Sequence, residues 1–148
     1  MNNPLTSVRA YEEFVYSLQQ TFPAIKVSTL VLKRQGRTVA ILVGELLFER
    51  DIRLFVRERL DFAFEEILGY GYEVWQGDNE LYWYDSHAHP HDPTLASTHP
   101  HHKHIPPDIK HHRIPAPELS FTKPNLPFLI QEIISHFFTP NDKADTKS

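Results

Sequence analysis

The feature that most constrains the fold is a run of short, strand-like segments between residues 25 and 85, joined by tight turns except over Asp61–Leu68, which could be a short helical turn or a loop. The expected strands are Ile25–Lys33, Thr38–Phe48, Ile52–Leu60, Tyr70–Trp75 and Glu80–Asp85. Their β-branched and alternating apolar residues are typical of strands, and Gly44 is expected to mark a β-bulge. Because the turns between them are too short for crossover connections, we expect a mostly antiparallel meander of about five strands.

Amphipathic helices are expected on both sides of this run. Apolar residues recur at spacings of three and four over residues 8–22, with Ser7 or Thr6 as the N-cap and Pro23 at the end. A second pattern of this kind follows Asn125, which is the expected N-cap of a C-terminal helix. Helices on one face of a meander make an α+β fold.

Composition changes abruptly after the last expected strand. Residues 86–124 hold nine of the ten histidines and eight of the twelve prolines. Because proline interrupts helices and central strands, we expect a long His/Pro-rich loop here. The prediction is a single α+β domain over residues 1–138 that contains this loop, followed by a disordered tail at residues 139–148.

Composition also excludes several classes of function. The chain has no cysteine, which rules out disulfides, thiolate catalysis and cysteine-ligated zinc. The formal net charge of −4 provides no general attraction to nucleic acid or to an anionic membrane. No apolar run reaches the ~18 residues of a membrane span, so we expect a cytoplasmic protein without a membrane partner.

Metal binding is one interpretation of the histidine-rich segment. Imidazole is a common ligand of divalent transition metals. His99, His101 and His104 are close enough in the chain to converge, and Asp85 could add an oxygen ligand. The spacing matches no recognised zinc pattern, so a divalent metal stays a secondary expectation and no other cofactor is expected.

Metal-free acid–base catalysis is a second interpretation. Two histidines can act as base and acid while a lysine stabilises the charge that develops on a phosphorane. His101, His102, Lys103 and His104 offer these groups in one segment, and such chemistry suits RNA cleavage through the 2′-hydroxyl. Alternation in an extended segment puts His101 and Lys103 on one side and the other two on the opposite side. The four side chains therefore need not face one site.

Two further features could bind a nucleotide, and each has a structural alternative. Arg57 and Arg59 could hold phosphate, although such arginines more often form a salt-bridged sheet face. Tyr72 belongs to a cluster of tyrosines and tryptophans that could stack bases, although aromatic pairs in sheets more often pack the core. The histidines themselves could simply be solvated residues on a proline-stiffened loop.

Several segments together resemble the TumE-like family of small prokaryotic proteins, named for the toxin of toxin–antitoxin pairs. They are Gly44–Phe48, Arg57–Asp61, Tyr70–Val74, Trp83–Asp85 and Pro100–His104. The most specific piece is Tyr-Asp followed, after a gap, by Pro-His-His-Lys-His. The matched polar positions are Arg57, Glu58, Tyr72, Tyr84, Asp85, His101, His102, Lys103 and His104. Additional histidines at 87, 89, 111 and 112 depart from the pattern.

The resemblance implies a cytoplasmic prokaryotic protein that binds a cognate antitoxin, and it supplies no mechanism. Joined to the residue chemistry, it predicts a toxin-like protein acting on RNA or a nucleotide. His101 and His104 would exchange protons and Lys103 would stabilise the oxyanion, while Arg57 held phosphate and Asp85 oriented a histidine. The alternative is a non-enzymatic protein-binding or metal-binding module, and an exposed edge strand could support a homodimer.

Overall fold

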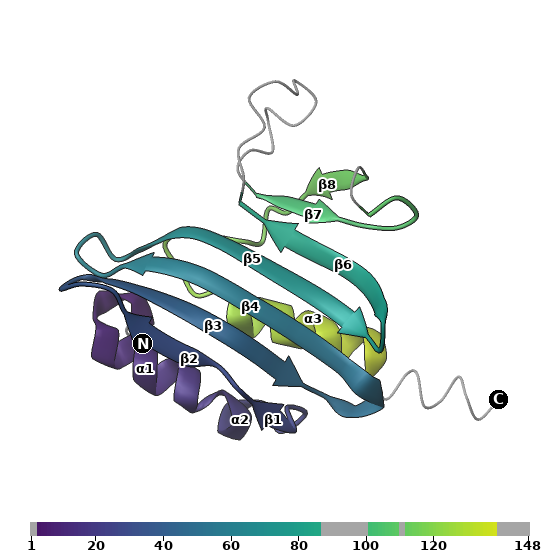
Figure 1. Ribbon diagram of the computed structural model, residues 1–148, viewed down its shortest axis with the longest axis horizontal. Coiled ribbons are helices and arrows are strands. Elements are labelled where there is room, and N and C mark those ends of the chain that lie inside the picture. Colours follow the sequence, from purple (N-terminus) through teal and green to yellow (C-terminus); the bar gives the residue numbers. More distant parts are fainter. Residues whose placement is uncertain (1–2, 87–100, 110–111, 139–148) are drawn as a thin grey trace.

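The computed structural model describes residues 3–86, 101–109 and 112–138. In these residues, helices cover one face of an antiparallel sheet of eight strands, which confirms the α+β class (Figure 1). The strands are β1 (Val27–Ser28), β2 (Val31–Arg34), β3 (Val39–Leu47), β4 (Ile52–Asp61), β5 (Glu66–Gln76), β6 (Asn79–Asp85), β7 (His102–His104) and β8 (Arg113–Pro115). The helices are α1 (Val8–Tyr16), α2 (Leu18–Thr21) and α3 (Leu126–Phe137), with short 3-10 segments η1 (Pro4–Thr6) and η2 (Glu49–Asp51).

The strands lie in the order β1-β3-β4-β5-β6-β7-β8, and β2 also pairs with β3. From β3 to β6 each strand pairs with the next one along the chain, as the short turns predict. Alternation in β4 buries Ile52, Leu54 and Val56 on the face that the helices cover, which we call the helix face. The core lies between this face and the helices.

The strand expected over residues 25–33 is divided into β1 and β2. Gly44 lies opposite the break, with a φ of 138° that favours glycine, and a Cβ there would lie 2.5 Å from the Thr29 carbonyl oxygen. The Thr29 hydroxyl accepts a hydrogen bond from the backbone N–H of Glu45 at 2.9 Å. The expected bulge at Gly44 is wrong, because pairing with β4 keeps its register through this residue. The glycine instead allows two backbones to approach closely.

The number of strands was underestimated because two of them lie in the region expected to be irregular. β7 lies between β6 and β8, so the prediction that no central strand forms over residues 86–124 is wrong. The prolines do not interrupt β7, since Pro100 and Pro106 lie outside it. Pro115 ends β8, the last strand in the sheet order, where a missing N–H is tolerated. Residues 87–100 of the expected loop and the expected tail at 139–148 lie outside the described residues.

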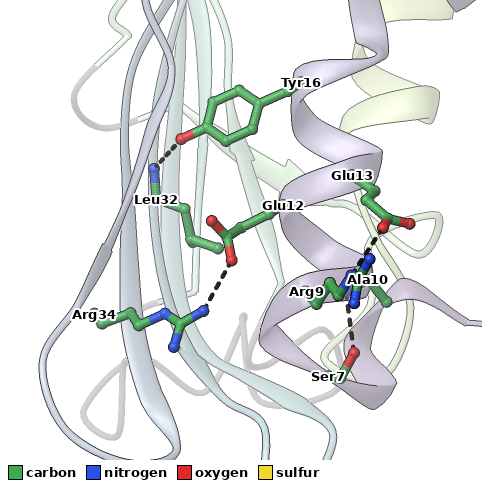
Figure 2. A network of polar contacts seen from close by, with 8 residues as sticks. All are labelled: Ser7, Arg9, Ala10, Glu12, Glu13, Tyr16, Leu32 and Arg34. Atoms are coloured by element: carbon green, nitrogen blue, oxygen red, sulfur yellow. Dashed lines mark hydrogen bonds and ion pairs between the residues drawn. The ribbon is translucent and has the colours of Figure 1, made fainter.

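The first helix is held at its start and along one side by polar contacts (Figure 2). The Ser7 hydroxyl caps α1 by accepting from the Ala10 N–H at 3.0 Å. The Tyr16 hydroxyl accepts from the backbone N–H of Leu32 at 3.1 Å, which satisfies a donor of β2. The single helix expected over residues 8–22 is divided at Ser17, whose hydroxyl donates to the Phe14 carbonyl.

The C-terminal helix begins as predicted, and it buries Leu126, Leu129, Ile130 and Ile133. Asn125 occupies the N-cap position, but its side chain makes no capping hydrogen bond. Its amide oxygen accepts from the Ser120 N–H at 2.9 Å, and its amide nitrogen donates to the Ser120 carbonyl at 3.0 Å. The side chain thus closes the loop before the helix instead of capping it.

Candidate functional site

The strand β7 distributes the histidine and lysine side chains of residues 101–104 over both faces of the sheet. Lys103 pairs with Tyr84 on β6, and both reach Glu132 of α3 on the helix face. His102 and His104 pair with Asp85 and Trp83 and therefore lie on the opposite face. The alternation predicted from the sequence is confirmed for this strand.

His101 lies on the helix face, just before β7. Its ring stacks on Tyr70 with centroids 5.7 Å apart and contacts Phe121 at 4.5 Å. The His101 Nδ1 atom lies 2.5 Å from the Tyr70 hydroxyl. Burial, and then the charge of Asp85, raises the pKa of Tyr70, so the phenol keeps its hydrogen at neutral pH. The structure thus separates His101 from His104, its predicted partner in proton exchange.

Lys103 is held in a polar cluster under α3. Its ammonium lies 3.0 Å from the Glu132 carboxylate and 4.4 Å from the centre of the Tyr82 ring. The Tyr84 hydroxyl donates to the same carboxylate at 2.8 Å. Burial and the Glu132 charge raise the pKa of Tyr84, which keeps the phenol protonated at neutral pH. The cluster joins α3 to β6 and β7, and it does not face the histidines of β7.

On the face opposite the helices, Asp85 lies close to both His102 and His104. Its Oδ2 atom lies 3.2 Å from Nε2 of His104, and its Oδ1 atom lies 3.9 Å from Nδ1 of His102. The Nδ1 atom of His104 lies 3.2 Å from the Ile109 carbonyl oxygen, which fixes the ring from its other side. Both imidazoles are buried, whereas the Asp85 side chain is 20% exposed. Solvent therefore reaches the Asp85 side chain more than either ring.

Arg57 and Asp85 lie in one row across this face. Strand register pairs Arg57 with Gly71, and Gly71 with Asp85. Gly71 leaves the space between them free, and a Cβ on it would lie only 2.9 Å from a terminal nitrogen of Arg57. Arg57 is exposed and makes no ion pair or hydrogen bond with any residue that the structure describes. Its guanidinium is thus available to an anion beside Asp85.

This face carries a continuous groove, and we call it the groove face. Hollows of about 440 Å³ and 160 Å³ share Arg57, Gly71 and Glu73, and the smaller one reaches Asp85. A third hollow of about 260 Å³ adjoins the first at Phe55 and Glu73. The groove thus extends across the middle strands of the sheet and ends at Asp85.

The two other predicted binding residues lie apart from Asp85. Arg59 is exposed and lies on the groove face by alternation, but it lines none of the hollows described above. The Tyr72 side chain is fully buried on the helix face, where its hydroxyl donates to Glu58 and accepts from Asn125. A phenol in that position packs the core, which is the structural alternative for this cluster of aromatic residues.

Glu58, one of the positions matched by the family resemblance, is fully buried and was given no role from the sequence. The alternation of β4 could have revealed it, because Glu58 continues the buried series of Val56 and Leu60. Its carboxylate accepts from the hydroxyls of Tyr11, at 2.5 Å, and Tyr72. Burial raises the pKa of Glu58, and the two phenol hydrogen bonds oppose that rise. Since Glu58 points toward the helices, it supports the fold and does not contact the groove.

The proposed metal ligands are not brought together by the described residues. His101 and His104 lie on opposite faces, and His99 lies outside the described residues. Among residues 3–86, 101–109 and 112–138, no group of three histidine or carboxylate side chains could hold a metal ion.

Comparison with known proteins identifies one family. A family model described as Toxin TumE matches residues 15–137, a range that includes all of α3 and every strand in the described part of the chain. No curated protein and no solved structure matches the chain. No helix in the described residues is long and apolar enough to cross a membrane.

Proposed function

The chain belongs to the family of the toxin TumE, and on that basis we propose that it is a toxin acting on RNA at the groove face of its sheet. Asp85 would act as the general base, and Arg57 would hold the phosphate. One observation supports this proposal most strongly. The guanidinium of Arg57, unpaired among the described residues, and the partly exposed side chain of Asp85 lie in one row across Gly71 and line the same hollow.

The chemistry follows from the 2′-hydroxyl of RNA. Asp85 would take the proton of this hydroxyl, and the oxygen would form a bond to the neighbouring phosphorus while the bond to the 5′-oxygen breaks. The products would be a 2′,3′-cyclic phosphate and a 5′-hydroxyl that takes its proton from water, and Asp85 would return its own proton to solvent. Arg57 would stabilise the negative charge on the phosphorane oxygens.

The histidines have a supporting role in this proposal. Contact of Asp85 with His104 on one side and His102 on the other restrains the carboxylate. Asp85 replaces His101 and His104 as the group that takes the proton in this proposal, because the two rings lie on opposite faces of the sheet. Lys103 stabilises no oxyanion here, since its ammonium is paired with Glu132.

RNA cleavage in the presence of EDTA tests the proposal. We expect the purified protein to cleave single-stranded RNA, and both D85N and R57A to lower the rate by about 100-fold or more. D78N and R37A alter exposed turn residues and serve as matched controls that keep the wild-type rate. Absence of cleavage by the wild type, or an unchanged rate in D85N, would contradict the enzymatic proposal.

We also propose a cognate antitoxin as the partner, which the toxin family supports, and the cytoplasm of a prokaryote as the location. A non-enzymatic binding module is the second candidate. It is favoured by the edge of the sheet at β1 and β2, where Val27 and Val31 are 46% and 45% exposed. This candidate predicts a stable complex with the product of the adjacent gene, weakened by V31K, together with no turnover of RNA.

A further inference from the structure

We propose that the hollow lined by Arg53, Phe55, Glu73 and Trp75 is a base-binding site that selects guanine. This inference rests on the proposed action on RNA and adds the base that is recognised. The hollow has a volume of about 260 Å³ and adjoins the larger hollow that contains Arg57. No role in the acid–base chemistry is assigned to these four residues.

The position of the hollow matches the length of a nucleotide. Phe55 and Glu73 face each other on β4 and β5, two residues along from the paired positions Arg57 and Gly71. Two residues of a strand span about 7 Å. A phosphate held by Arg57 would therefore place its attached base over Phe55 and Glu73.

The walls of the hollow suit the flat surface of a base. Phe55 and Trp75 are partly exposed aromatic residues on neighbouring strands. The guanidinium of Arg53 lies 5.1 Å from the centre of the Phe55 ring, and it also donates to the Gly77 carbonyl at 2.9 Å. These two contacts restrain the Arg53 guanidinium, and its cation–π contact in turn restrains the Phe55 ring. Aromatic surfaces of this kind stack nucleobases.

Glu73 supplies the selectivity. Its Oε1 atom accepts from the Trp75 indole N–H at 3.2 Å, which orients the carboxylate within the hollow. Glu73 forms no ion pair with any residue in the described part of the chain, although Arg53 and Arg57 line the same groove. A carboxylate only accepts hydrogen bonds. Guanine presents two adjacent N–H groups on its Watson–Crick edge, whereas adenine, cytosine and uracil each place an acceptor next to a donor there.

Binding of mononucleotides to the full chain tests this inference directly, with tryptophan fluorescence as the readout. We expect 5′-GMP to bind at least about tenfold more tightly than 5′-AMP, 5′-CMP or 5′-UMP. Inosine 5′-monophosphate lacks the 2-amino group and should bind with intermediate affinity, a result that needs no variant. E73Q should lose about tenfold in affinity for GMP and little for AMP. The exposed-turn variant E65Q should bind like the wild type.

The outcomes separate this inference from the proposed function. R57A should weaken all four mononucleotides to a similar extent, since it removes only the phosphate contact. GMP selectivity without RNA cleavage would support the base site and contradict the enzymatic proposal. RNA cleavage with equal binding of all four mononucleotides, or a GMP preference unchanged in E73Q, would overturn the base site alone.

Discussion

At the scale of single residues, the stability of the fold depends on how Glu58, a buried carboxyl group, is hydrogen-bonded. A carboxyl group without solvent contact needs hydrogen-bond donors, and Glu58 obtains them from Tyr11 and Tyr72. Burial raises the pKa of Glu58, and it raises the pKa of both phenols well above their usual value. The phenols therefore keep their hydrogens, while the carboxyl group binds its proton more tightly in the folded chain than in the unfolded one.

This difference predicts a pH dependence of stability. The stabilising contribution of Glu58 to the free energy of unfolding is complete below its ordinary pKa of 4.5. This contribution is lost as pH rises through the raised pKa of the folded chain. The free energy of unfolding should therefore fall with rising pH in this window, by at most about 1.4 kcal/mol per pH unit. The glutamine side chain in E58Q cannot titrate, so this variant should lack the fall in the free energy of unfolding that Glu58 causes.

Urea unfolding of both proteins from about pH 4 to pH 8 measures the difference. E65Q, which changes an exposed glutamate in a turn, should keep the wild-type dependence. If E58Q and the wild type changed in parallel over this range, the raised pKa would be refuted.

At the scale of elements, the pairing of β1 and β2 with β3 depends on one glycine. Thr29 and Leu30 cross Gly44 so closely that a Cβ would lie 2.5 Å from the Thr29 carbonyl oxygen and 2.8 Å from the Leu30 Cα. Both neighbours are backbone atoms, so a rotamer change cannot relieve the contact. Gly36, in the turn that follows β2, has no atom within 4 Å of an added Cβ.

We expect G44A to lower the free energy of unfolding by about 3 kcal/mol, because the clash adds to the strain of a φ of 138°. G36A should change it by less than about 1 kcal/mol. Thermal unfolding followed by circular dichroism compares the two variants. Equal stability of G44A and G36A would show that the two backbones separate without cost.

At the scale of the whole molecule, the two faces of the sheet have different roles. The helix face is anchored at Glu58, because Tyr11 of α1 reaches it directly and Asn125, at the start of α3, reaches it through Tyr72. The groove face carries Arg57 and Asp85 on strands that this anchor supports. Stability and proposed chemistry thus reside on opposite sides of the same strands.

This arrangement predicts that α1 and α3 are energetically coupled. Y11F should cost about 2 kcal/mol, because it removes a hydrogen bond to a buried carboxyl group. Combined with N125A, it should deviate from additivity by about 0.5 kcal/mol or more, since both changes act on the Glu58–Tyr72 pair.

Y16F is the matched control, because Tyr16 lies on the same helix and its hydroxyl accepts from the backbone N–H of Leu32 in β2 rather than contacting Glu58. Its effect should add to that of N125A within about 0.5 kcal/mol. Urea unfolding of the wild type, the three single variants and the two double variants measures these couplings. An additive Y11F/N125A pair would mean that the helices are anchored independently.

Much of this architecture was determined locally by the sequence. Short turns and alternating residues are enough to specify the meander from β3 to β6, and the amphipathic pattern specifies α1 and α3. Alternation alone also separates His102 and His104 from Lys103. These features depend on neighbours within one strand or helix, so a single sequence reveals them.

Only the tertiary structure decided which of these residues meet. β7 and β8 were missed because tertiary pairing, of β7 with β6 and of β8 with β7, makes strands of a region rich in proline. The partners of Glu58 come from α1 and β5, and the row of Arg57, Gly71 and Asp85 comes from three strands in register. A sequence pattern specifies the face on which a side chain lies, but register across the sheet determines what lies beside it.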